Sequence, residues 1–305
     1  MSGYPPSKVH VNASCTSCTQ FTAVSYFYAI ACESISATVH AFKGVLTSMK
    51  VHHNYQYLLR QISKEKKEGL RVLDYGCGKG VLVESGRSEG IDMYGVELFA
   101  AGSGVDIREK ALGYGGGGII KEITKGKIPF PDNFFDIVVS NQVFEHVPEL
   151  KPVFSEIDRV VKPGGKLICI FPSKDAIREG HCEVPFVHWL KPKSPLQYQM
   201  LKLSRKIGLG RRKKVTDPDE WATYFSDWLA ANTFYKPYKS IRKQLLAHFP
   251  SIKSIEYDYI AYRLQARRKL WSMLGLLCAL PGFSTLFRIF CIRFGSHVLV
   301  CKKVA

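Results

Sequence analysis

The sequence lacks the cysteine spacing of a disulfide framework or of a zinc site. Its nine cysteines follow no repeating interval, and Cys169 and Cys301 fall inside apolar runs typical of strands. Cys15 and Cys18 form one C-x-x-C pair, but no second pair of matching spacing accompanies them. A zinc knuckle is therefore not predicted, and we expect reduced thiols in a cytoplasmic setting.

The sequence also lacks an uninterrupted hydrophobic run of membrane-spanning length. Leu270–Phe287 contains no charged residue in eighteen positions, which is near the lower limit for a spanning helix, but Pro281 and Gly282 interrupt it. Two short helices fit this segment better. They would either pack against a helical cap formed by residues 173–248 or face lipid or line a substrate site.

Arginine is absent from residues 1–48, which contain a single acidic residue, Glu33. An organellar transit peptide would need arginine, and no clear cleavage site follows the apolar run Phe21–Cys32, so neither kind of targeting peptide is predicted. We expect this segment to be a poorly ordered or loosely packed extension of a domain that spans residues 49–305.

Acidic residues are scarce: 26 Asp and Glu stand against 43 Lys and Arg, for a formal net charge of +17. Such a charge favours nucleic acid, an anionic membrane surface, or a phosphorylated or carboxylated substrate as a partner. Lys191–Lys214 contains nine basic residues and no acid, which fits either a solvated helix face or a surface that attracts such a partner. Further basic residues are Lys236, Lys239, Arg242, Lys243, Arg263, Arg267, Arg268 and Lys269.

From about Leu70, short apolar strands alternate with helical segments. The clearest helix starts at Leu150, where apolar residues repeat at helical spacing as far as Val161. This alternation predicts an α/β fold whose mainly parallel sheet carries helices on both faces. The expected strands are Arg71–Tyr75, Met93–Glu97, Gly118–Ile123, Phe135–Ser140, Lys166–Phe171, Ile252–Ile260 and His297–Val300.

The alternation stops after Pro172. Residues 173–248 have the pattern of loops and helices, which predicts a helical cap inserted after the fifth strand, over the carboxyl ends of the strands. Residues 263–294 are expected to form a second, hydrophobic helical insertion.

A glycine-rich motif follows the first strand. Val72–Gly80 has the sequence VLDYGCGKG, and a helix is expected to begin near Val81. Glycines let the backbone turn tightly and approach a ligand closely, and the helix presents free N–H groups and a positive dipole end. A simple tight turn or a dinucleotide-binding loop would show the same motif. Glu97 ends the next strand, where an acid can accept hydrogen bonds from both hydroxyls of a ribose.

Two further blocks follow in order. Ile128–Val147 reads IPFPDNFFDIVVSNQVFEHV, and Glu156–Leu167 reads EIDRVVKPGGKL. Together with the glycine motif and Glu97, they resemble the class I S-adenosylmethionine-dependent methyltransferases, in particular the methyltransferase type 11 group, over about residues 70–172. The resemblance implies a Rossmann-like sheet of seven strands, mainly parallel with an antiparallel last strand. It also implies S-adenosyl-L-methionine as cofactor, at the carboxyl ends of the first two strands.

The same resemblance assigns cofactor-binding roles. The loop residues would surround the methionine moiety, Glu97 would hold the ribose, and two polar residues after the fourth strand would lie beside the sulfonium and the substrate entrance. The family often has an acid near the adenine after the third strand, and Glu122 is its match here, shifted in register. The full set is Asp74, Gly76, Cys77, Gly78, Gly80, Glu97, Glu122, Asn141 and Gln142.

Three histidines are candidates for a catalytic base: His146, His181 and His188. An oxygen or carbon nucleophile needs its proton removed, for which an imidazole is suited, whereas a carboxylate acceptor needs only positioning. His146 could instead make a structural hydrogen bond, and the other two could serve substrate contact or cap packing. No metal site is predicted, because the spacing of His181, Cys182, Glu183 and His188 matches no standard ligand set.

The function predicted from these features is methyl transfer to a small-molecule, lipid-linked or glycan-linked acceptor that is anionic or amphipathic, at or near a membrane surface. One alternative is an RNA or DNA methyltransferase, which the charge alone suggests. Ser140–Val143 lacks the Asn/Asp-Pro-Pro-Tyr/Phe block that base-methylating enzymes often use. The other alternative is a non-catalytic module that binds the cofactor, against which the intact loop and Glu97 argue.

Overall fold

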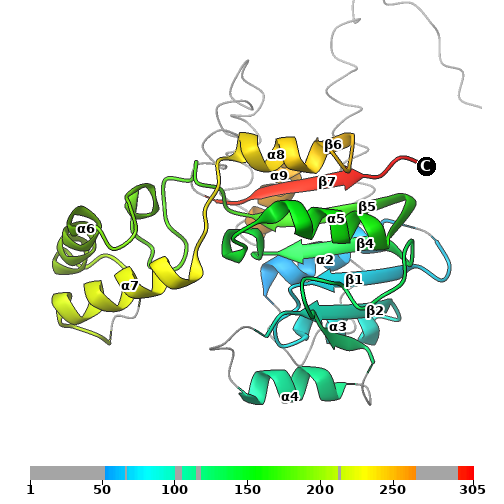
Figure 1. Ribbon diagram of the computed structural model, residues 1–305, viewed down its shortest axis with the longest axis horizontal. Helices are drawn as coiled ribbons and strands as arrows, with labels where there is room; N and C mark the ends of the chain where they lie inside the picture. The colour runs from blue at the N-terminus through cyan, green and yellow to red at the C-terminus, as the bar shows by residue number, and fades with distance from the viewer. Residues whose placement is uncertain (1–51, 66, 100–104, 115–117, 212–213, 266–294) are drawn as a thin grey trace, which may run out of the picture. The chain divides into compact units, whose positions relative to one another are not determined.

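The computed structural model describes residues 52–305 except 66, 100–104, 115–117, 212–213 and 266–294 (Figure 1). The predicted extension 1–48, its Cys15 and Cys18, the apolar segment Leu270–Phe287 and the basic residues at 267–269 lie outside the described residues. Among the residues that are described, no helix combines the length and apolar character needed to cross a membrane.

Seven strands form one sheet in the order β3-β2-β1-β4-β5-β7-β6. β7 is antiparallel to both of its neighbours, β5 and β6, while β1 to β5 pair in parallel (Figure 1). The predicted Rossmann-like architecture is therefore confirmed. The strands are β1 (Arg71–Tyr75), β2 (Asp92–Glu97), β3 (Ile120–Glu122), β4 (Phe135–Asn141), β5 (Val161–Phe171), β6 (Ser251–Ser254) and β7 (His297–Lys302).

Helices cover both faces of the sheet. Because successive strand residues point to opposite faces, Leu73 and Val138 pack in one apolar core while Val72 and Val139 pack in another. α5 (Leu150–Val160) and α8 (Tyr238–Leu246) contribute to the first core, and α2 (His53–Ser63), α3 (Val81–Ser88) and α9 (Glu256–Gln265) to the second. α4 (Val105–Gly113) packs beside β3. Six of the seven residues of β4 are buried, as its nearly continuous apolar sequence predicts.

The strand predicted at Ile252–Ile260 is wrong in its second half. β6 ends at Ser254, and α9 begins at Glu256. Acidic residues occupy the first turn of α9, where they favour the positive end of the helix dipole. Ile255 and Tyr259 are four residues apart and are buried in the same core, so this apolar pattern belongs to a helix face.

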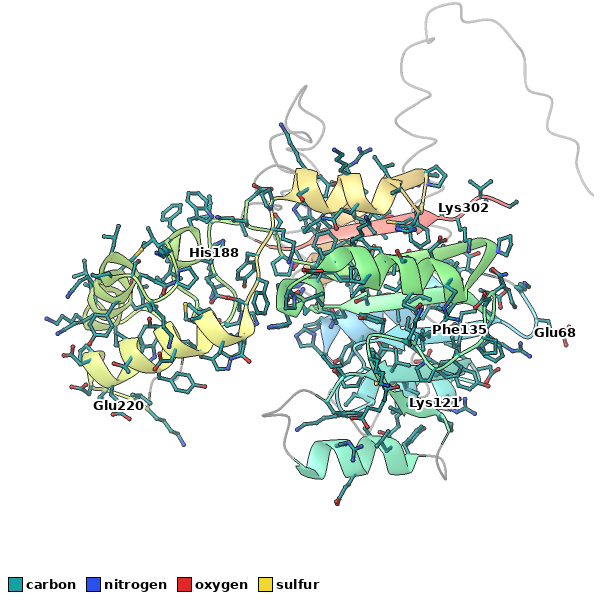
Figure 2. All side chains as sticks on the ribbon, in the orientation of Figure 1. Glu68, Lys121, Phe135, His188, Glu220 and Lys302 are labelled. Atoms are coloured by element: carbon teal, nitrogen blue, oxygen red, sulfur yellow. The ribbon has the colours of Figure 1, made fainter. Side chains whose placement is uncertain are left out.

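The helical segment after β5 has a core of its own. η4 (Val187–Trp189), α6 (Pro195–Lys206) and α7 (Pro218–Asn232) surround the buried Trp221 together with Leu201 and Phe225. Figure 2 shows His188 within this segment and Phe135 within the sheet. α8 also falls inside the predicted insertion 173–248, but Ile241 and Leu245 pack in the sheet core. We use the term cap below for the segment Val187–Asn232 alone.

Candidate active site

A glycine-rich loop joins β1 to α3 at the carboxyl end of β1. Gly76, Gly78 and Gly80 have positive φ angles of 78°, 53° and 77°. A Cβ at Gly76 would collide with the side chain of Val143, so only glycine fits between this loop and the segment after β4. A Cβ at Gly78 would meet nothing within 4 Å. The loop therefore turns sharply and borders open space beside the start of α3.

Glu97 is the last residue of β2, and its carboxylate faces this loop. The register between β1 and β2 pairs Tyr75 with Val96, which brings the end of β2 beside the loop. The N–H of Gly78 donates to Oε2 of Glu97 at 2.8 Å, and the N–H of Leu98 donates to Oε1 at 2.8 Å. The acid expected to hold a ribose thus lies against the expected methionine loop, while the ribose contact itself stays a prediction.

Asp74 and Cys77 are both buried beside the loop, at 3% exposure each. Burial, reinforced by the charge of Glu97, raises the pKa of Asp74 to about 8. Cys77 instead packs with Val83 and Ile120 in a small apolar cluster. Its thiol is therefore a packing group, and only its backbone belongs to the loop surface.

The start of α2 completes this side of the site, and the sequence interpretation missed it. Asn54 donates through Nδ2 to Oδ1 of Asn141 at 2.8 Å, and Tyr259 donates to Oδ1 of Asn54 at 2.5 Å. Burial and then the charge of Asp74 raise the pKa of Tyr55 to about 12, while a hydrogen bond with Asn141 opposes the shift. Tyr55, Asp74 and Asn141 therefore lie together. The only available signal was an aromatic helix shortly before β1.

Gln142 and Glu122 are engaged by other residues. Gln142 has a φ angle of 57°, and its Nε2 donates to the hydroxyl of Ser296, just before β7, at 3.0 Å. Glu122 accepts hydrogen bonds from the guanidinium of Arg108 on α4. An adenine contact by Glu122 would have to share its carboxylate with Arg108.

Two of the three candidate bases come together. His146 lies in η3 (Phe144–His146), directly after β4, and its ring centroid is 5.0 Å from that of His181. Nδ1 of His146 lies 2.6 Å from the Asn232 carbonyl, and Nδ1 of His181 lies 2.6 Å from Oε1 of Glu179. Both acceptors require a protonated Nδ1, so Nε2 is the nitrogen that each ring offers to a ligand or a proton. The ring of Trp228 lies 4.7 Å from that of His181.

The pKa values of two buried acids beside these histidines are shifted in opposite directions. Burial, with the nearby charge of Glu179, raises the pKa of Glu145 to about 8. Burial also opposes the ionisation of Glu179, but hydrogen bonds from His181, Cys182 and Tyr235 outweigh it and lower the pKa of Glu179 to about 2. Glu179 is therefore a fixed charge that orients His181, whereas neither carboxylate oxygen of Glu145 has a hydrogen-bond partner among the described residues.

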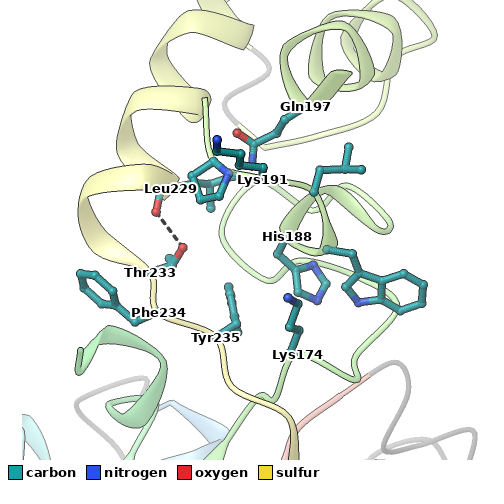
Figure 3. A pocket seen from close by; sticks show the side chains of 11 residues that line it. Lys174, His188, Lys191, Gln197, Leu229, Thr233, Phe234 and Tyr235 are labelled. Atoms are coloured by element: carbon teal, nitrogen blue, oxygen red, sulfur yellow. Dashed lines mark hydrogen bonds between the residues drawn. The ribbon is translucent and has the colours of Figure 1, made fainter. Parts of the chain in front are cut away.

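His188 lies apart from this pair, in a cavity of about 400 Å³. The cavity mixes cationic and apolar side chains, as Figure 3 shows, with Lys174 and Lys191 beside Leu229 and Phe234. Burial lowers the pKa of His188. Tyr235 connects the two places, because its ring lies 4.9 Å from that of His188 and its hydroxyl donates to Oε1 of Glu179 at 2.7 Å.

Comparison with known families identifies one match. Residues 49–246 match the family described as methyltransferase domain.

Among curated proteins, a sterol 24-C-methyltransferase of Gibberella zeae is 38% identical over 109 residues, which are 32% of this chain and 27% of that protein. A ubiquinone biosynthesis O-methyltransferase of Sinorhizobium medicae is 31% identical over 105 residues, which are 34% of this chain and 42% of that protein. The chain thus spans less than half the length of either relative. A solved S-adenosylmethionine dependent methyltransferase from Mesorhizobium loti has 15% identity and a TM-score of 0.48, over 81% of this chain and 96% of that one.

Proposed function

The chain belongs to the methyltransferase domain family, and from this membership we propose that it transfers the methyl group of S-adenosylmethionine to a small-molecule acceptor. The observation that carries the proposal is the contact between the Gly78 N–H and the carboxylate of Glu97, at a loop that borders open space. A nucleoside with a charged side chain needs both features: backbone room beside a helix start, and a carboxylate for its sugar.

The proposed cofactor contacts follow from these positions. The loop backbone from Gly76 to Gly80 receives the methionine moiety, with Asp74 beneath it. Glu97 holds the ribose hydroxyls, and Glu122 lies on the adenine side. Asn141 is oriented by Asn54 and borders the sulfonium, with Gln142 behind it.

The cofactor supplies an electrophilic methyl group, and this chain's residues supply alignment and a proton acceptor. Nε2 of His146 or His181 can take a proton from an acceptor hydroxyl, because each Nδ1 is already committed. Burial lowers the pKa of His146, so its imidazole is neutral and ready to accept a proton at neutral pH. His188 contributes to acceptor binding in this proposal.

The acceptor proposed here is anionic or amphipathic. The cavity beside His188 offers Lys174 and Lys191 to a negative group and Trp189, Leu229 and Phe234 to an apolar one. A sterol methyltransferase and a ubiquinone biosynthesis O-methyltransferase are among the relatives, and both names denote apolar or amphipathic products. The net charge of +17 favours an anionic membrane surface as the place where such an acceptor is met.

Calorimetry with S-adenosylhomocysteine tests the cofactor site. We expect Glu97→Ala to weaken binding at least about tenfold, because a charged hydrogen bond to the sugar is lost. Glu109→Ala, an exposed acid on α4, is the matched control and should bind as the wild-type chain does. Equal affinity of both variants would show that the ribose contact is misplaced.

Incubation of the chain with labelled cofactor and cell extracts tests the acceptor class. The label should enter small molecules or lipids. Label in the nucleic acid fraction would favour an RNA or DNA methyltransferase, and binding of S-adenosylhomocysteine without transfer to any fraction would favour a non-catalytic module.

A further inference from the structure

Glu145, His146 and His181 bring three metal-ligating groups to one point. One carboxylate oxygen and one nitrogen from each ring all lie within 4.8 Å of one another. The first two residues belong to the turn after β4, and the third belongs to the loop after β5. The fold therefore assembles the cluster from two segments whose sequence spacing resembles no short ligand motif, which is why the sequence predicts no metal.

The carboxylate of Glu145 lacks the partner that a buried acid needs. Glu145 is 2% exposed, and within the described part of the chain neither its Oε1 nor its Oε2 has a hydrogen-bond partner. Leaving such a group unpaired in the interior is costly, and buried charges in proteins are normally paired or coordinate a metal. A cation bound between Glu145 and the two imidazoles would remove this cost.

Both imidazoles are already oriented as metal ligands usually are. His146 donates from Nδ1 to the Asn232 carbonyl, and His181 donates from Nδ1 to Glu179. Glu179 is itself held by the Cys182 N–H at 2.6 Å and by the Tyr235 hydroxyl at 2.7 Å. Histidine ligands characteristically donate their second ring N–H to a carbonyl or carboxylate, which fixes the ring and leaves Nε2 for the ion.

We propose that Glu145, His146 and His181 form a binding site for a divalent transition-metal ion of the zinc and cobalt type. Two imidazoles and one carboxylate suit such ions better than Mg²⁺ or Ca²⁺, which prefer oxygen ligands. Three protein ligands leave one coordination position for another molecule, as in catalytic rather than structural sites.

The site has a role in the reaction that rests on the proposed function. Val143, two residues before Glu145, packs against Gly76 of the loop, so the cluster adjoins the expected cofactor site. An acceptor oxygen would occupy the open position. With the ion bound, Nε2 of His146 and His181 is a metal ligand and no longer a proton acceptor. The ion would instead lower the pKa of the bound hydroxyl, whose proton passes to solvent. That oxygen then bonds to the methyl carbon as the carbon–sulfur bond breaks and its electron pair stays on sulfur. The acceptor class is therefore one with a hydroxyl or carboxyl oxygen.

Titration of the metal-stripped full chain with Co²⁺ alone, followed by visible absorption, tests the site without cofactor or acceptor. We expect one Co²⁺ per chain with a spectrum of nitrogen and oxygen ligands. Glu145→Gln and His181→Ala should each weaken binding roughly tenfold to hundredfold. His53→Ala, a histidine at the start of α2, should retain wild-type affinity. So should Cys15→Ser/Cys18→Ser, which removes a competing thiol pair.

Wild-type affinity in both Glu145→Gln and His181→Ala would overturn the site, as would a thiolate-to-cobalt charge-transfer band as the sole signal. Glu145→Gln keeps the shape of the side chain and removes its charge, so its metal-free melting temperature should not fall. S-adenosylhomocysteine binding, measured separately, distinguishes the two proposals. Its absence alongside intact Co²⁺ binding would reject the proposed function and support the metal site.

Discussion

The two halves of the candidate site are built in different ways. The centre of the cofactor side comes from consecutive elements, β1, α3 and β2, where the backbone N–H of Gly78 meets Glu97. Side chains of α2 and of the end of β4 complete it. The acceptor side combines η3, the loop after β5, the end of α7 and Tyr235, and its contacts run through side chains. A ligand shared by a whole family can be held by local backbone geometry. A ligand particular to one chain is met by residues that only the folded structure brings together.

The halves nevertheless share one electrostatic feature. Each contains a buried acid, Asp74 or Glu145, and burial raises the pKa of each to about 8. A nearby cation would stabilise the ionised form of either acid. The two proposals place the charged cofactor near Asp74 and a metal ion at Glu145.

The largest effect is expected on the cofactor side, from Gly76→Ala. An alanine at this position would have to keep the positive φ of Gly76, and its Cβ would collide with the side chain of Val143. We expect about 2–4 kcal/mol of lost stability and at least about tenfold weaker S-adenosylhomocysteine binding. Chemical denaturation and calorimetry measure the two effects.

Gly90→Ala is the matched control, because Gly90 has a φ of 81° but open space around its Cβ position. It should lose about 1 kcal/mol of stability from backbone strain alone and bind the ligand normally. If the two variants behaved alike, the close approach between loop and β4 segment would have no role.

Asp74→Asn should separate stability from binding. The pKa of Asp74 is raised from 3.8 to about 8, so the folded chain holds this proton more tightly than the unfolded chain does. Its contribution to stability is therefore fully present below pH 3.8 and is lost progressively as the pH rises to about 8. The variant should be more stable than the wild-type chain by about 1–3 kcal/mol at pH 8, with the gap narrowing toward pH 4.

The same variant should bind S-adenosylhomocysteine more weakly. Thermal unfolding between pH 4 and pH 8 gives the stability gap, and a gap that stays constant with pH would contradict the assigned ionisation of Asp74.

The smallest effect is expected on the acceptor side, from Tyr235→Phe. This change removes one hydrogen bond to the buried Glu179 and leaves the ring that packs beside His188. We expect about 1 kcal/mol of lost stability, unchanged S-adenosylhomocysteine affinity and a reduced kcat for methyl transfer. Weakened S-adenosylhomocysteine binding would show that the two halves are not energetically separate.

Much of the cofactor side could be predicted from the sequence, because its signals are local. The strand before Gly76, the loop itself and the acid at Glu97 are each visible in a short window. The predicted strand Phe135–Ser140 matches β4, and Lys166–Phe171 matches the second part of β5, which begins at Val161. The resemblance implies seven strands that are mainly parallel with an antiparallel last strand, and the structure confirms this arrangement.

The acceptor side could not be predicted in the same way. His146 and His181 were identified as candidates, but their proximity depends on how two loops pack. Glu145 lies within a recognised block, yet nothing local distinguishes a buried acid from an exposed one. Tyr235 gives no sequence signal. The strand prediction over Ile252–Ile260 was wrong in its second half because apolar residues four positions apart fit a helix face as well as a short strand.

The carbonyl of Asn232 determines which nitrogen of His146 carries the proton. α7 ends at Asn232 and belongs to the cap core, whereas His146 belongs to the turn after β4. A displacement of α7 would take this carbonyl away, and the imidazole would then redistribute its proton between both nitrogens. The nitrogen resonances of His146 in solution would therefore report directly whether the end of α7 holds this hydrogen bond.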